Sequence, residues 1–221
     1  DEIEIQFKSR VSERLRHKNR AVSEWDYERI VLEHFPEVEA ARCLSCCDGN
    51  GKFAPGHITL LLFPYKNELN GTDQLQPKLT DKTLCDVEAY LKERMSPFVK
   101  LHVINPKYVS ATVECDIKLA KGCNDTTYYE ELLNEALKQY LAPWYETSEP
   151  IQIDADKNHS NVIEFLNELE YVDNVDTTTI KIIVENKEIK DGSVLQPQNP
   201  IKVLTSSLNH TINISIHEQE Q

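Results

Sequence analysis

The chain has 221 residues, of which 40 % are hydrophobic and 28 % charged, as is typical of a globular protein of one or two domains. Its net charge of −13 argues against general binding to nucleic acid or to an anionic membrane surface, because both depend on positive charge. The longest apolar run, from Ile58 to Phe63 and interrupted by Thr59, is far shorter than the roughly 20 residues that span a bilayer. The first residue is Asp1 rather than Met, so we expect the chain to be a piece of a longer protein.

The charge is unevenly distributed along the chain. Residues 1–35 carry 7 Lys or Arg against 8 Asp or Glu, so the other 186 residues account for −12 of the net charge. Within residues 1–35, which we call the head, several basic residues form a cluster. One interpretation of this basic cluster is a solvated helix face. The other is a surface that docks onto an acidic neighbour, which includes another copy of the same protein. The cluster consists of Arg10, Arg14, Arg16, Lys18 and Arg20.

The first third of the chain predicts two helices and a hairpin. Apolar residues at helical spacing predict a first helix over residues 3–18. Ser23 and Asp26 stand in capping-box positions at the start of a second helix, which Pro36 ends. The hairpin is predicted by two β-rich runs on either side of a Gly-Asn-Gly turn, Val38 to Cys47 and His57 to Phe63.

The clearest pattern lies between Val109 and Leu119, where six apolar and five polar residues alternate strictly. Such alternation requires a strand with one face on a core and the other in solvent. A helix follows, with Thr127 and Glu130 as its predicted capping box. The other predicted elements are a helix from Leu84 to Met95, strands over residues 99–103, 151–153 and 179–184, a helix over 162–169 capped by Asn158 or Ser160, and a β segment over 200–216.

Residues 57–153 therefore have the order strand, helix, strand, strand, helix, strand. This order matches a ferredoxin-like split βαβ sandwich, in which two helices cover an antiparallel sheet. We predict an α+β fold in three parts. They are the N-terminal helices with the first hairpin strand over residues 1–56, the ferredoxin-like domain over 57–155, and a C-terminal helix with a β segment over 156–221.

The sequence offers little chemistry. Cys43, Cys46 and Cys47 form half of a zinc knuckle, but a second close pair of ligands is missing. We expect the six cysteines to be reduced thiols, with Cys85 and Cys115 on the apolar faces of their elements. The chain has no Gly-rich phosphate loop and no nucleophile elbow. We therefore predict no catalytic residue, no metal ligand and no cofactor, and do not expect an enzyme.

Several stretches resemble one known family. RAVSEWDYERIVLEHFPEVEAARC, residues 20–43, is similar to the part of baseplate J-like proteins in which an Arg-Ala start precedes a "DYE" helix, a Pro and a strand. APGHITLLLFP, residues 54–64, resembles the family's Pro-Gly-His strand, and VINPKYV, residues 103–109, resembles its V-x-x-P-x-Y-V junction. The resemblance extends from about residue 10 to residue 216, and we interpret the chain as a C-terminal fragment of such a protein.

The resemblance implies a structural wedge subunit of a contractile phage tail or of a type VI secretion-like injection system. Such subunits assemble in a sixfold ring around the tail hub, where they contact copies of themselves and other wedge proteins. They take no nucleic acid, membrane or small-molecule substrate, and they assemble in the cytoplasm before becoming part of a virion or injection-particle baseplate. Because the family motifs mark no interface, the basic head supplies the candidate interface residues: Arg10, Arg14, Arg16 and Arg20.

Two other classes of function stay open at this point. A ferredoxin-like ligand-binding or regulatory module would need a pocket lined by polar groups near His102 or Tyr108. A metal-assisted hydrolase would need the cysteines to converge on one ion. The sequence does not distinguish a phage tail from an extracellular injection particle or a secretion apparatus.

Overall fold

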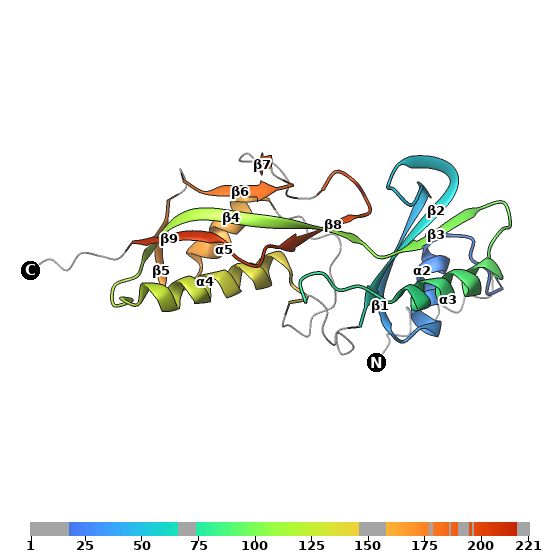
Figure 1. The fold of residues 1–221 in the computed structure, drawn as a ribbon, viewed down its shortest axis with the longest axis horizontal. Coiled ribbons are helices and arrows are strands. Elements are labelled where there is room, and N and C mark those ends of the chain that lie inside the picture. The colour runs from blue at the N-terminus through green and yellow to red at the C-terminus, as the bar shows by residue number, and fades with distance from the viewer. Residues whose placement is uncertain are drawn as a thin grey trace, which may run out of the picture. The chain divides into compact units, whose positions relative to one another are not determined.

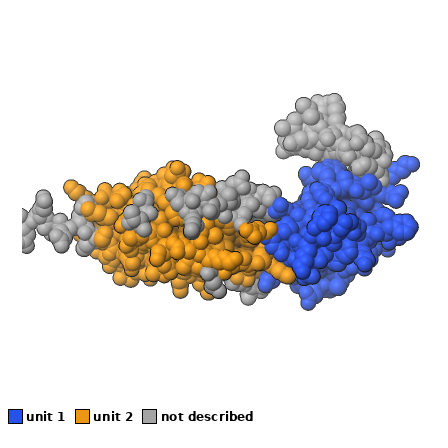
Figure 2. All heavy atoms as spheres, turned by 90° about the horizontal axis from the view of Figure 1, so that it is seen from above, with its two compact units in different colours: residues 1–73, 77–106, 199–201 blue, residues 74–76, 107–198, 202–221 orange. Residues whose placement is uncertain are grey.

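The computed structural model describes residues 18–65, 74–145, 158–176, 179–185, 187–189, 195 and 197–215. The chain forms two compact units, coloured blue and orange in Figure 2. In the described ranges, no helix is both long enough and apolar enough to cross a membrane. Unit 1 comprises Asp1–Asp73, Pro77–Pro106 and Asn199–Ile201, and unit 2 comprises Gln74–Gln76, Lys107–Gln198 and Lys202–Gln221.

Unit 1 is a layer of helices on one face of a sheet (Figure 1). The strand order is β1-β2-β3, in which β1 and β2 pair antiparallel while β2 and β3 pair parallel. Helix α3 lies between the two parallel strands in the chain, as a parallel connection requires. The elements are α2 (Glu24–His34), β1 (Val38–Cys47), β2 (Phe53–Pro64), α3 (Asp81–Lys92) and β3 (Lys100–Ile104).

The core of unit 1 joins the apolar stripes of both helices to the sheet. Tyr27 and Val31 of α2 and Val87 and Leu91 of α3 are buried in one cluster with residues of the strands. In each helix the two residues are four apart, so they lie on one face. His34 is exposed in the last turn of α2 and stacks on the Tyr90 ring with 3.9 Å between centroids.

Unit 2 is built around one long strand, β4 (Lys107–Leu119), which is the long green arrow in Figure 1. Strands β6 and β8 both pair with β4 at Ala111, and β5 and β9 both pair with it at Ile117, so each pair must occupy opposite edges. Short strands thus cover both edges of β4. The remaining elements are α4 (Thr126–Leu141), α5 (His159–Asn167), β5 (Val172–Val175), β6 (Lys181–Val184), β7 (Lys187–Ile189), β8 (Lys202–Ser206) and β9 (Thr211–Ser215).

The predicted one-sided burial of β4 is confirmed. Every odd-numbered residue from Val109 to Leu119 is at most 8 % exposed, whereas the polar residues between them are not buried. The buried face packs with Leu133 and Leu137 of α4 and with Val162 of α5 in a single cluster. The alternation in the sequence therefore located both the strand and its core-facing side.

The α+β class is confirmed, but the ferredoxin-like arrangement over residues 57–155 is wrong. Strands β3 and β4, which were placed in one sheet, belong to different sheets, and the units divide between Pro106 and Lys107 instead of at the predicted boundaries. The Asn105 carboxamide accepts from Leu79 N and donates to Leu79 O, both at 2.9 Å, so its side chain takes up backbone groups where β3 ends. Beyond it, β4 pairs with strands from the last third of the chain.

The helix caps were partly predicted. The capping box of Ser23 and Asp26 is present, and of the two predicted caps of α5, Asn158 and Ser160, the structure has Asn158. The cap of α4 is Asp125, whose carboxylate accepts from Tyr128 N at 3.1 Å, and not Thr127. Asp125 was overlooked because Thr127 has Glu130 three residues later, as a capping box requires, whereas Asp125 has Tyr128 at that position. Residues 3–17 of the predicted first helix and the predicted strand over 151–153 lie outside the described residues.

A histidine closes the gap between β8 and β9. The ring of His210 lies where the β8 and β9 edge of β4 has no strand partner, and its Nδ1 accepts from Val113 N at 3.1 Å. Since Nδ1 accepts, the proton of the neutral ring is on Nε2, which is 3.0 Å from Ser206 Oγ. Burial and, to a smaller extent, the Lys138 charge lower the pKa of His210 to about 4. The fold therefore holds this imidazole neutral.

We expect His210 to make the stability of the chain depend on pH. Its pKa is about 4 in the fold against an ordinary value of 6.5, so its contribution is complete above pH 6.5 and is lost as the pH falls to 4. The loss is on the order of 3 kcal/mol. Denaturant unfolding of the wild type and of His210→Asn between pH 7.5 and 4 measures it. The stability difference between the two proteins should shrink toward acid, and a constant difference would contradict the assignment.

Candidate interaction site on helix α2

The start of α2 is held by a closed set of hydrogen bonds. Asp26 Oδ2 accepts from Ser23 N at 2.7 Å and from Val22 N at 3.1 Å, and Ser23 Oγ accepts from Asp26 N. The residue before them, Ala21, donates its N–H to the carbonyl of Arg94 at 2.9 Å. These bonds fix the path of the chain into the helix, and with it the position of Arg20.

Two carboxylates of α2 cover the free edge of β1. Glu28 Oε1 accepts from Cys43 N at 2.8 Å, and Glu24 Oε1 accepts from Ser45 N at 3.2 Å. The match is geometric, because four residues of helix rise about 6 Å and two residues of strand about 6.6 Å. Unpaired N–H groups of an edge strand invite another strand. Here side chains of α2 satisfy two of them, and these two bonds hold α2 against β1.

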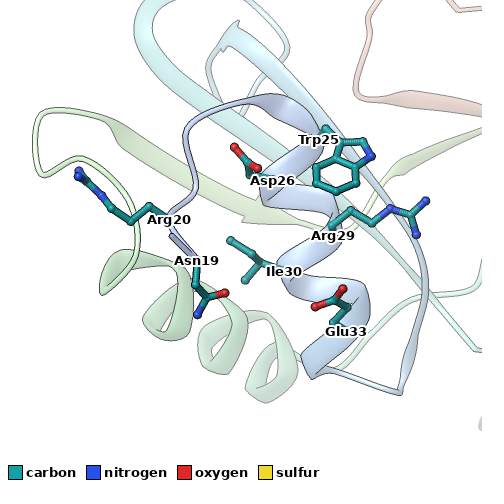
Figure 3. Close-up of a pocket in the computed structure, with 7 residues that line it drawn as sticks. All are labelled: Asn19, Arg20, Trp25, Asp26, Arg29, Ile30 and Glu33. Carbon is teal, nitrogen blue, oxygen red and sulfur yellow. The ribbon is translucent and has the colours of Figure 1, made fainter. Parts of the chain in front are cut away.

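A pocket lies beside α2, on the surface of unit 1 (Figure 3). Ile30 lies at its centre, between the side chains of Arg20 and Arg29, and Trp25 is beside Arg29. The guanidinium carbon of Arg29 is 5.7 Å from the centroid of the Trp25 ring, a cation–π contact. We call this site the α2 pocket; it is lined by Asn19, Arg20, Trp25, Asp26, Arg29, Ile30 and Glu33.

The structure places one of the four predicted interface residues at this pocket. Arg20 is exposed on its rim, whereas Arg10, Arg14 and Arg16 lie outside the described residues. Trp25 and Arg29 were not predicted as site residues. The available signal was their spacing, because residues four apart on a helix project from the same face.

Comparison with known proteins supports an assembly role for this chain. The model of the family described as "Baseplate protein PVC11-like" matches residues 1–207. The chain belongs to the PVC11-like family of baseplate proteins. The predicted function as a structural baseplate component is thereby confirmed, while the match does not identify the family as baseplate J-like. No curated protein matches the chain.

A solved structure has the same fold as this baseplate protein. It is the cryo-EM structure of the anti-feeding prophage baseplate, 6-fold symmetrised, with a TM-score of 0.65 and 18 % sequence identity. The alignment covers 93 % of this chain and 42 % of the other one, so this chain spans less than half the length of that baseplate chain. At this identity the likeness concerns the fold.

The cysteines of the baseplate protein do not converge. Among the described residues no group of three or more His, Cys, Asp or Glu side chains could hold a metal ion, and the cysteines are free thiols. Cys115 is buried in the core, as its apolar position predicted. Cys85 is exposed on α3, so its predicted apolar placement is wrong. It stands on the outer side of the helix, away from buried Val87 and Leu91.

The two residues named for a ligand-binding module lie in different units. In unit 1, His102 Nε2 is 3.0 Å from His57 Nδ1, so the two imidazoles bond to each other. In unit 2, Tyr108 is close to Trp144, with 6.2 Å between ring centroids, and burial raises the pKa of its phenol. Each side chain is engaged inside its own unit, and neither lines the α2 pocket.

Thiol labelling should separate the cysteines by their burial. Burial raises the pKa of both Cys43 and Cys115 to about 12, and Glu24 and Glu28 add to the effect at Cys43. Because the thiolate is the reacting form, we expect these two to be labelled at least about 100-fold more slowly than exposed Cys46 in the native protein at pH 8. Mass spectrometry after timed maleimide exposure measures the rates.

The control for this labelling is the unfolded protein. In denaturant all six thiols should react at similar rates. If Cys43 in the folded protein reacted as fast as Cys46, its burial under α2 would be contradicted.

Proposed function

We propose that this baseplate protein is a wedge component of the baseplate J-like type in a contractile injection system, assembling in a ring around the tail hub. The main support is the family match over residues 1–207, which agrees with the motifs of residues 20–43, 54–64 and 103–109. The fold likeness to the anti-feeding prophage baseplate adds to it. Neighbouring wedge subunits and further copies of the chain are the partners, and nucleic acid, membrane and small-molecule substrates have no part.

In this proposal the protein works mechanically and without catalysis. Each unit has its own tightly packed core, and interiors of this kind resist deformation and transmit strain. Contraction would then repack the interfaces between subunits while the units themselves stay intact. Assembly takes place in the cytoplasm, before the particle is complete.

Imaging of intact particles tests the proposed place of the protein. A label attached to this subunit should appear at the plate at the end of the sheath, in a ring around the hub, in every particle. The control is the same label on a sheath protein, which should decorate the length of the tail. A label found along the tube, or absent from purified particles, would rule out the wedge assignment.

The basic head is part of the same proposal. We propose that Arg10, Arg14, Arg16 and Arg20 contact an acidic surface of a neighbouring subunit, on the strength of the −12 carried by residues 36–221. Like-charge juxtaposition at an interface is unfavourable, and attraction between opposite charges speeds docking.

Charge reversal tests the role of this head. Arg10→Glu with Arg14→Glu should lower the incorporation of the subunit into baseplates, measured as subunits per particle, while the circular dichroism spectrum stays unchanged. The matched control reverses two exposed lysines elsewhere, Lys82→Glu with Lys121→Glu, which alters the net charge equally. Equal incorporation of both variants would contradict a role for the head.

A further inference from the structure

We propose that the α2 pocket receives the acidic corner between α5 and β5 of a neighbouring copy, where Glu168 and Glu170 face Arg29 and Arg20. The inference rests on the ring assembly proposed above and deepens it by naming the two surfaces. It adds Arg29, Trp25 and the two glutamates to the interface.

The first argument is that the pocket holds two uncompensated cations. Arg20 and Arg29 are both exposed, and within the part of the chain that the structure describes neither has a carboxylate in ion-pair contact. The acidic residues of the pocket are already engaged: Asp26 accepts the bonds of the capping box, and Glu33 has an interaction of its own. The positive charge therefore remains available to a partner.

The second argument concerns the shape of the pocket. Arg20 and Arg29 lie on opposite sides of Ile30, and the Trp25 ring lies next to Arg29 (Figure 3). Arginine binds carboxylates through a planar fork of donors, and an adjacent aromatic ring helps to hold the guanidinium in place. A segment with two carboxylates on either side of an apolar side chain complements this order of cation, apolar side chain and cation.

The third argument is that the α5–β5 corner presents such a segment. Glu168 and Glu170 are exposed on either side of half-buried Leu169. Neither glutamate has an ion-pair or hydrogen-bond partner for its side chain among the described residues. Residues 168–170 therefore have the order carboxylate, apolar side chain, carboxylate, with both charges free.

The position of Glu168 strengthens this choice of partner. Glu168 is the C-cap of α5, and the last turn of that helix contains no basic residue. A carboxylate at the negative end of a helix dipole is unfavourable. An arginine from another copy would offset this cost, so α5 is more stable in the assembly than alone.

A second exposed acidic pair serves as the internal comparison. Glu130 and Glu131 are also exposed and without side-chain ion pairs among the described residues. They lie in the N-terminal half of α4, where the helix dipole tolerates acidic residues. The physical argument for an absent cation thus applies to Glu168 and not to this pair.

A charge swap in the assembling baseplate protein tests the contact. Arg20→Glu with Arg29→Glu should weaken incorporation into baseplates by about fivefold or more, as should Glu168→Arg with Glu170→Arg, because each removes about 1 kcal/mol or more of attraction. All four changes in one chain restore the net charge of −13 and should recover most of the incorporation. The defect of the single pairs should be smaller in high salt.

The control combines the same arginine reversals with Glu130→Arg and Glu131→Arg, which restores the same net charge at the wrong surface. This control should stay defective. If this control recovers incorporation as well as the four-residue swap does, the proposed partner surface is wrong. It is also wrong if the four-residue swap fails to recover incorporation while each double variant alone is defective. If neither pair affects a subunit that imaging still finds in the baseplate, the contact is wrong although the wedge assignment stands; absence of the wild type from the baseplate would overturn the wedge assignment itself.

Discussion

Strand β4 needs hydrogen-bond partners for its backbone, because its odd-numbered side chains from Val109 to Leu119 are buried in the core, where water cannot serve the backbone. Unit 2 is arranged to meet this requirement. Strands β5 and β6 pair with one edge, and β8 and β9 with the other. Each of these strands is short, so the sheet forms only when the last third of the chain returns to β4. At the break between β8 and β9, His210 Nδ1 is the acceptor for Val113 N.

Unit 1 meets the same requirement by different means. On its edge strand β1, the N–H groups of Cys43 and Ser45 donate to the carboxylates of Glu28 and Glu24, so another strand could pair with these groups only by displacing the two side chains. Contacts on this side of the unit must then use side chains on the outer face of α2. Arg29 and Trp25 lie on that face, on the same helix as the two glutamates. Contacts between exposed charged groups can break and re-form with a new partner at a low cost in free energy. This suits the repacking of subunit interfaces that we propose for contraction of the baseplate.

The candidate site was only partly accessible from the sequence. Arg20 was a candidate because it ends a visible run of basic residues, and the structure places it, exposed, at the α2 pocket. Arg29 and Trp25 were not found, because a single Arg and a single Trp in a helix are ordinary by composition. Their value as site residues depends on which nearby carboxylates are already hydrogen-bonded. The Asp26 carboxylate is, because it accepts from the backbone N–H groups of Val22 and Ser23. Local sequence does not show such occupancy.

The sequence by itself determined the α+β class, the hairpin, the cap of α2 at Ser23 and the buried face of β4. Each of these follows from spacing within a few residues, where the physics is local. The tertiary structure alone decided which strands are neighbours. Alternation shows that β4 has a buried side, but the partner of a strand depends on long-range packing. The prediction therefore placed β3 and β4 in one sheet, although they belong to two different sheets. Position 210 shows the same limit. His210 is a structural acceptor because β8 and β9, which flank it in the chain, leave the N–H of the distant Val113 unpaired.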